Sequence, residues 1–192
     1  MEAARRVIAR KGLEQTTLRD ISREGGFTTG VVTHHFSDKQ AVIVAAFLAA
    51  SEDFEAYARA ELAAAGSPEE RLRTLIRVSA PDDRKHRADW RVWSEMWTYA
   101  GRDPALGKEL IATDARWEVL IAEVLSQARD AGVLRRDLDV AVEAPILARL
   151  IDGVGLRAWI GGDWSRARQL LVAHLGMLGM PETMQGSLTD ER

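Results

Sequence analysis

A chain of 192 residues, 46% hydrophobic and 29% charged, can form two unequal domains and is too apolar to remain disordered. It contains no cysteine, which excludes disulfides, cysteine–zinc sites and thiol catalysis. The longest apolar run is the ten residues 41–50, whereas a membrane-spanning helix needs about 20, so we expect a cytoplasmic protein without a membrane span or a signal peptide.

The net charge of −3 is distributed unevenly along the chain. Residues 1–45 contain seven basic and five acidic residues, a net charge of +2, and the remaining residues carry a net charge of −5. A positive segment permits nucleic-acid binding, but it is equally common on an ordinary solvated surface, so charge alone does not decide.

Helix signals follow one another along the chain and no alternating strand pattern occurs, which predicts an all-α fold. The first four helices are expected at residues 2–11, 18–24, from 28 onward, and 38–64. Thr17 and Asp20 have the spacing of a capping box, and Ser37 is the expected cap of the fourth helix. Later start signals stand at Ser67-Pro68, Pro81-Asp82, Asp103-Pro104, Asp139 and Asp163.

The first three helices are too short to be stable alone, so they must share a core. Its expected members are Val7, Ile8, Leu13, Leu18, Ile21, Phe27, Val31, Val32 and Phe36. A short turn containing Gly25 and Gly26 joins the second and third helices, and such a turn predicts a helix-turn-helix motif. We therefore expect a three-helix DNA-binding domain at 1–45, a larger helical ligand-binding and dimerisation domain at 46–180, and a flexible tail at 181–192.

The third helix is rich in residues that are poor helix formers, which suits a DNA groove better than a core. Threonine side chains can contact phosphates or base edges, a glycine allows close approach, and a lysine at a helix start favours a phosphate. The predicted DNA-contacting residues are Thr17, Arg19, Thr28, Thr29, Gly30, Thr33, His34, His35 and Lys39. Thr17 is equally well explained as a helix cap alone.

The segment 3–48 resembles the N-terminal signature of the TetR family of repressors. The resemblance rests on the runs Thr16-Thr17-Leu18-Arg19-Asp20-Ile21, Gly25-Gly26-Phe27-Thr28-Thr29-Gly30 and His35-Phe36-Ser37-Asp38-Lys39. The chain departs from the family pattern at Gly25, where alanine is usual, and at Thr33 and His34, where tyrosines are usual. Relatives also begin several residues earlier with a basic arm, so Met1 is a candidate late start.

Two other classes of function were weighed against a regulator. A helical enzyme has no support, because the chain lacks the common nucleophile, zinc-protease and phosphate-loop motifs. A helical small-molecule-binding module without a role on DNA would require the Thr/His surface of residues 28–35 to be accidental. A metal at His34 and His35 is not expected, because adjacent helical residues point about 100° apart, and we expect no cofactor.

Six tryptophans, none before residue 90, mark the second domain. Trp90, Trp93 and Trp97 recur at helical spacing, which indicates either plain core or an aromatic ligand pocket. The predicted ligand-binding residues are Trp93, Met96, Trp97, Trp117, Ile121, Asp152 and Trp159. Aromatic rings beside an acid such as Glu95 or Asp152 would suit a cationic ligand.

Parts of residues 80–178 resemble the choline-responsive, BetI-type members of the same family. The resemblance rests on Trp90, Trp93, Met96 and Trp97, on Asp103-Pro104-Ala105-Leu106, and on Leu150-Ile151-Asp152-Gly153.

A palindromic operator requires a dimer, because two recognition helices must reach successive major grooves about 34 Å apart. We expect the homodimer to form through the helices at 139–160 and 164–178, as in the family. The expected contacts are Ala144, Leu147, Ala148, Ile151, Gly155, Leu170, Leu171, Ala173, Leu175 and Leu178, with a monomer core as the alternative. Ligand binding is expected to tilt the fourth helix and release the DNA; the sequence leaves open the converse, in which ligand promotes binding.

Overall fold

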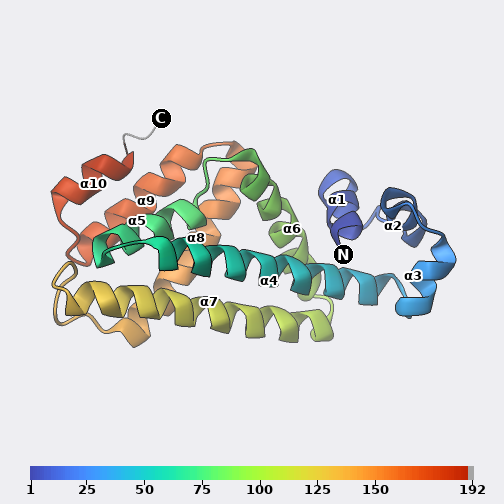
Figure 1. Ribbon diagram of the computed structural model, residues 1–192, viewed down its shortest axis with the longest axis horizontal. Helices are drawn as coiled ribbons and strands as arrows, with labels where there is room; N and C mark the ends of the chain where they lie inside the picture. The colour runs from blue at the N-terminus through green and yellow to red at the C-terminus, as the bar shows by residue number, and fades with distance from the viewer. Residues whose placement is uncertain (190–192) are drawn as a thin grey trace. The chain divides into compact units, whose positions relative to one another are not determined.

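The computed structural model describes residues 1–189, without the side chains of residues 84, 85, 88 and 187–189, and contains only helices within that range (Figure 1). The helices are α1 (Glu2–Lys11), α2 (Leu18–Gly25), α3 (Thr29–His35), α4 (Lys39–Ala64), α5 (Pro68–Ser79), α6 (Arg84–Ala100), α7 (Pro104–Asp130), α8 (Val140–Gly161), α9 (Trp164–Met177) and α10 (Glu182–Thr189). The predicted all-α fold is confirmed. Over the described residues, no helix is both long and apolar enough to cross a membrane.

Most helix starts are fixed by the predicted caps, although α3 has no side-chain cap and Asp83, rather than the predicted Pro81-Asp82, caps α6. Thr17 accepts a hydrogen bond from the Asp20 amide, and Asp20 in turn accepts from the Thr17 amide, which completes the predicted capping box. Ser67, Asp139 and Asp163 cap α5, α8 and α9. The predicted cap Ser37 is wrong, because Asp38 accepts the hydrogen bond from the Ala41 amide at the start of α4.

The chain divides into two compact units that differ from the two predicted domains. The first unit comprises residues 1–54 and 88–111, and the second comprises 55–87 and 112–192. Most of α6 therefore belongs with the helix-turn-helix segment rather than with the C-terminal helices.

The core of the first unit joins the three N-terminal helices to α4 and α6. Phe47 of α4 and Met96 of α6 are fully buried in the same cluster as Val7 and Ile8 of α1. Leu13, Ile21 and Val32 are buried there as predicted, and Leu18 and Phe36 pack against the cluster half-buried. The prediction was wrong for Phe27 and Val31, which are 41% and 46% exposed.

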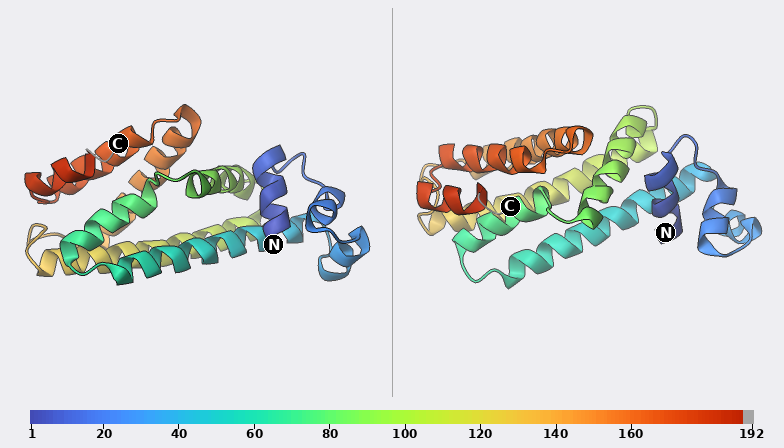
Figure 2. Two further views of the ribbon diagram at one scale, coloured as in Figure 1. Left: turned by 45° about the horizontal axis from the view of Figure 1, so that its top comes forward. Right: turned by 90° about the horizontal axis from the view of Figure 1, so that it is seen from above.

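In the second unit α8 and α9 form a helical hairpin, and α10 folds back against α9 (Figure 2). The loop at Gly162 closes the hairpin with a left-handed glycine. Residues 182–189 were expected to belong to a flexible tail, but they form α10, and Met184 is buried. The end of the chain, 190–192, lies outside the described residues.

The capping box predicts how stability depends on pH. Hydrogen bonds from Lys11 and Thr17 lower the pKa of Asp20 to about 2, although burial opposes them. Because the pKa is depressed in the folded state, the stabilisation is complete above the ordinary value near 4 and is lost as the pH falls through about 2. Asp20→Asn should therefore lower the melting temperature at pH 7, and its difference from the wild type should shrink between pH 4 and 2. Thermal melts followed by circular dichroism measure this, and a difference independent of pH would contradict it.

Candidate nucleic-acid interface and effector site

The turn between α2 and α3 sets the orientation of the third helix. Gly26 ends α2 in the left-handed conformation, with φ 72° and ψ 22°, which suits a residue without a Cβ atom. Thr28 is extended and precedes α3. On α3 only Val32 is buried, so the helix presents most of its circumference to solvent. This is the geometry of a helix-turn-helix motif with an accessible third helix.

The nine predicted DNA-contacting residues lie at the surface of the first unit. Eight of them are exposed, and Lys39, at the first position of α4, is half-buried. Lys39 Nζ donates a 2.9 Å hydrogen bond to the carbonyl oxygen of Glu14. This bond ties the start of α4 to the loop that precedes α2.

Several threonine hydroxyls of this surface already have partners within the protein. Thr29 Oγ1 lies 3.2 Å from Ser22 Oγ, and Thr33 Oγ1 donates to the Thr29 carbonyl at 3.2 Å. Thr17 Oγ1 donates to Asp20 at 2.7 Å as part of the capping box. The Thr29–Ser22 contact depends on how α2 and α3 pack, so the sequence could not show it, whereas the other two bonds are local.

Most basic side chains of this segment are neutralised by acids of the same unit. Arg6 and Arg10 both pair with Glu24, which lowers the pKa of its carboxyl. Lys11 and Arg23 both pair with Asp20. Among the residues that the structure describes, Arg19 has no ion-pair partner. Arg19 and Lys39 are thus the cations of the predicted set that have no carboxylate partner there.

The rings of His34 and His35 make an edge-to-face contact, with centroids 5.2 Å apart. Within the described part of the chain, no group of three or more histidine, aspartate or glutamate residues is placed to hold a metal ion.

The predicted effector residues of α6 lie in the first unit. Met96 is fully buried in its core, and the Trp93 ring packs edge-on against Phe47 and Phe54, at 5.4 and 6.2 Å between centroids. Trp97 is half-buried and contacts the Trp90 ring edge-on. The aromatic stripe is therefore real, and part of it packs against α4.

Glu95, on the same helix, binds the N-terminal segment. Its Oε2 accepts a 3.1 Å hydrogen bond from the Leu13 amide, in the loop after α1. The left-handed Gly12, with φ 79°, brings the loop so close that a Cβ atom there would lie 3.1 Å from the Glu95 carboxylate. Of the two acids suggested for a cationic ligand, Glu95 thus already has a structural partner.

The other predicted effector residues lie in the second unit. Ile121 is fully buried, whereas Trp117, Asp152 and Trp159 are half-buried. Burial raises the pKa of Asp152 to about 6; Arg149, 3.3 Å away, opposes this rise, and Asp114 and Glu118 add to it.

An acidic cluster surrounds Arg149, and we define it as Asp114, Glu118 and Asp152. Arg149 binds Asp114 at 2.9 Å and Glu118 at 3.3 Å, so one cation faces three carboxyl groups. Arg149, Asp114 and Glu118 were not among the residues predicted from the sequence. Their spacing of four on α7, and of three between Arg149 and Asp152 on α8, was the available signal.

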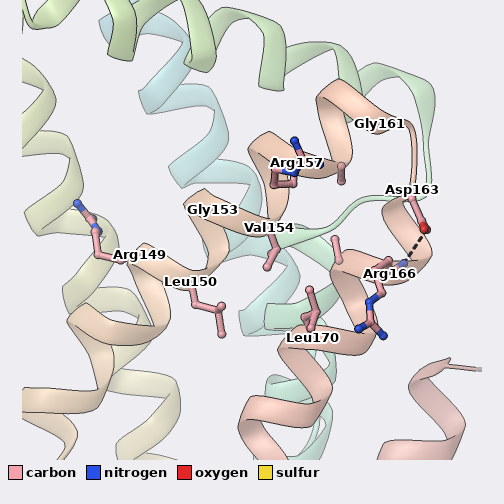
Figure 3. A pocket seen from close by; sticks show the side chains of 11 residues that line it. Arg149, Leu150, Gly153, Val154, Arg157, Gly161, Asp163, Arg166 and Leu170 are labelled. Atoms are coloured by element: carbon pink, nitrogen blue, oxygen red, sulfur yellow. Dashed lines mark hydrogen bonds between the residues drawn. The ribbon is translucent and has the colours of Figure 1, made fainter.

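The surface of α8 and α9 carries a groove of about 480 Å³ (Figure 3). Its lining residues are Arg149, Leu150, Gly153, Val154, Arg157, Ala158, Gly161, Asp163, Arg166, Ala167 and Leu170. Eight of the ten residues predicted for the dimer interface are instead buried within the single chain; Leu170 and Ala173 are exposed. These eight residues therefore belong to the core of the single chain, which was the alternative interpretation.

A row of exposed apolar residues runs along the same hairpin and shares Leu170 with the groove: Val142, Ile146 and Ile160 on α8, and Leu170 and Met177 on α9. Their spacing places them on the outer stripe of each helix together with the groove. The apolar periodicity of the sequence did not separate this outer stripe from the buried one.

Comparison with known proteins agrees with this architecture. Residues 1–46 match the family "Bacterial regulatory proteins, tetR family", and residues 68–179 match "BetI-type transcriptional repressor, C-terminal". The HTH-type transcriptional regulator BetI of Burkholderia cenocepacia is 30% identical over 182 residues, covering 91% of this chain and 88% of its own length.

Solved structures show the same fold. A transcriptional regulator from Saccharomonospora viridis in complex with choline superposes with a TM-score of 0.82 at 28% identity, covering 91% of this chain and 92% of its own. A TetR-family regulator from Rhodococcus sp. has a TM-score of 0.80 at 24% identity, covering 93% and 95%. The protein is therefore a ligand-responsive DNA-binding regulator rather than an enzyme, and the chain belongs to the TetR family, with a C-terminal region of the BetI type.

Proposed function

We propose that the protein is a repressor that binds a near-palindromic operator as a homodimer and is released by a small cation. The observation that supports this most is the exposed α3, which follows the left-handed turn at Gly26 and buries only Val32 in the core of the first unit. A helix held in this way can enter a major groove.

The proposed DNA contacts fall into two classes. Arg19 and Lys39, with the cap Thr17, contact phosphates and position the domain. Residues 28–30 and 33–35 of the third helix and its cap face the groove. Of these, Thr28 and His34 offer exposed side-chain groups for base edges, whereas Thr29 and Thr33 each already make one hydrogen bond within the protein and keep only part of their hydrogen-bonding capacity for DNA.

The proposed dimer pairs the outer faces of α8 and α9, within the ranges 139–160 and 164–178, across a two-fold axis. The apolar row, in which Ile160 and Met177 are 65% and 72% exposed, and the groove, which is lined by apolar residues together with Arg149, Arg157, Asp163 and Arg166, form one surface that a second copy would cover. Two such hairpins would make a four-helix bundle.

The proposed effector is a small organic cation. The acidic cluster around Arg149 has more negative than positive groups, and the half-buried Trp117 precedes Glu118 directly. Trp159 of α8, in the same unit as the acidic cluster, is a further aromatic candidate for a cation–π contact, and Trp93 and Trp97 of α6 are the proposed effector residues of the first unit. Choline, bound by the relative from Saccharomonospora viridis, is the first probe to use.

A double substitution tests the DNA-binding surface. Thr28→Ala with His34→Ala removes side chains that point to solvent, so the melting temperature should stay within about 1 °C, since exposed substitutions change stability little. Binding to a fluorescent DNA fragment from upstream of its own gene, measured by anisotropy at fixed salt, should weaken at least about tenfold, since lost base contacts cost roughly 1–3 kcal/mol each. The control is Thr98→Ala, an exposed threonine of α6. Unchanged affinity of the double variant would reject the proposed surface.

Gly30 provides a test that separates stability from binding. A Cβ atom at Gly30 would meet only Thr28 Oγ1, at 3.7 Å, and its backbone is helical, so Gly30→Ala should stabilise the fold by up to about 1 kcal/mol. The added methyl group would occupy space between the helix and the DNA, so operator affinity should fall. Chemical denaturation and anisotropy measure the two effects. A more stable variant with undiminished affinity would show that Gly30 does not approach the DNA closely.

The pKa of Asp152 predicts the pH dependence of effector binding. Asp152 is protonated below about pH 6 and ionised above it, so choline affinity should rise about tenfold between pH 5 and 7. Asp152→Asn should bind choline more weakly and without this pH dependence, whereas Asp137→Asn, at an 85% exposed side chain, should behave like the wild type. Isothermal titration calorimetry measures the affinities. A wild-type affinity that does not change with pH would exclude Asp152 from the effector site.

A further inference from the structure

Two large apolar side chains at the start of the third helix are exposed to solvent. Phe27 lies just before α3 and Val31 lies in its first half, with 41% and 46% of their surfaces exposed. Apolar side chains of this size usually add to a core, and here the core is completed without them by Val32 and Phe36. Phe27 and Val31 are therefore candidates for contact with a binding partner.

Val31 lies on the outward face of α3. Val32 is buried and Phe36 half-buried, and they define the inward face. His34 lies four positions after Gly30 and three after Val31, so these three residues share the opposite face. Because Gly30 has no side chain, the isopropyl group of Val31 can approach a surface in front of the helix without obstruction.

The Phe27 ring is held by the turn. A Cβ atom on Gly25 would lie 2.1 Å from the nearest ring carbon of Phe27, so the ring rests directly on the backbone at the end of α2. Only glycine at position 25 leaves this space, which explains the departure from the usual alanine. The ring therefore lies against the turn in the protein without DNA.

The chemistry of this face favours apolar recognition of DNA. The hydroxyls of Thr29 and Thr33 each already make a hydrogen bond within the protein, and beside them Val31 and Phe27 are prominent exposed apolar groups next to His34. The apolar group that a major groove presents is the C5 methyl of thymine. We propose that Val31, together with Phe27, contacts thymine methyl groups and so determines part of the operator sequence. This proposal rests on the DNA-binding surface proposed above.

The test compares thymine with deoxyuridine, which lacks only the methyl group. The protein first selects its preferred duplex from a random pool, and each thymine of that duplex is then replaced singly by deoxyuridine. At the contacted position the wild type should lose about fourfold in affinity, the effect of burying one methyl group. Val31→Ala should bind the thymine and deoxyuridine duplexes equally at that position. Val119→Ala, at an exposed valine of α7, should discriminate like the wild type.

Three outcomes would overturn the proposal. Equal wild-type affinity for all deoxyuridine duplexes would show that no methyl group is read, while leaving operator binding intact. Full discrimination by Val31→Ala and by a folded Phe27→Ala would assign the methyl contact to other residues. A selection that yields no preferred sequence would reject the proposed DNA-binding surface as well.

Discussion

The structure depends on the core that the DNA-binding helices share with α4 and α6. Helices α1 to α3 contain ten, eight and seven residues, too few for independent stability. Their apolar faces are covered by Phe47 of α4 and by Val92 and Met96 of α6, and Glu95 adds a hydrogen bond to the Leu13 amide. The DNA-binding helices therefore cannot change position without a response from α6.

This shared core suggests a route for regulation. The sequence pointed to α4 as the lever, because α4 begins beside Lys39 and continues for 26 residues. The structure adds α6, which carries the tryptophan stripe and reaches the core of the DNA-binding helices in one compact unit. A second hydrogen bond links α4 to the loop after α6. Gln40 of α4 donates to Asp103, which also caps α7. A displacement of α6 would therefore reach α3 through this shared core.

Most local signals, apart from the cap at Ser37, were read correctly from the sequence, whereas several features of long-range packing were not. Thr17, Ser67 and Asp163 act as caps because a cap needs only its own next turn. Phe27 and Val31 were placed in the core because an apolar residue in a short helix is usually buried. The same limit applies to α8 and α9, since periodicity finds apolar stripes but does not say which one packs inside the chain. The place of α6 in the first unit depends on contacts across some 80 residues of sequence, such as Leu13 with Glu95.

Native-state hydrogen exchange on Met96→Ala tests the shared core most directly. Removing this fully buried side chain should lower the free energy of opening by about 2–5 kcal/mol. If the DNA-binding helices and α6 form one cooperative unit, the amides of α1 to α3 should lose as much protection as those of α6. A loss confined to α6, with the protection of α1 to α3 unchanged, would contradict the account.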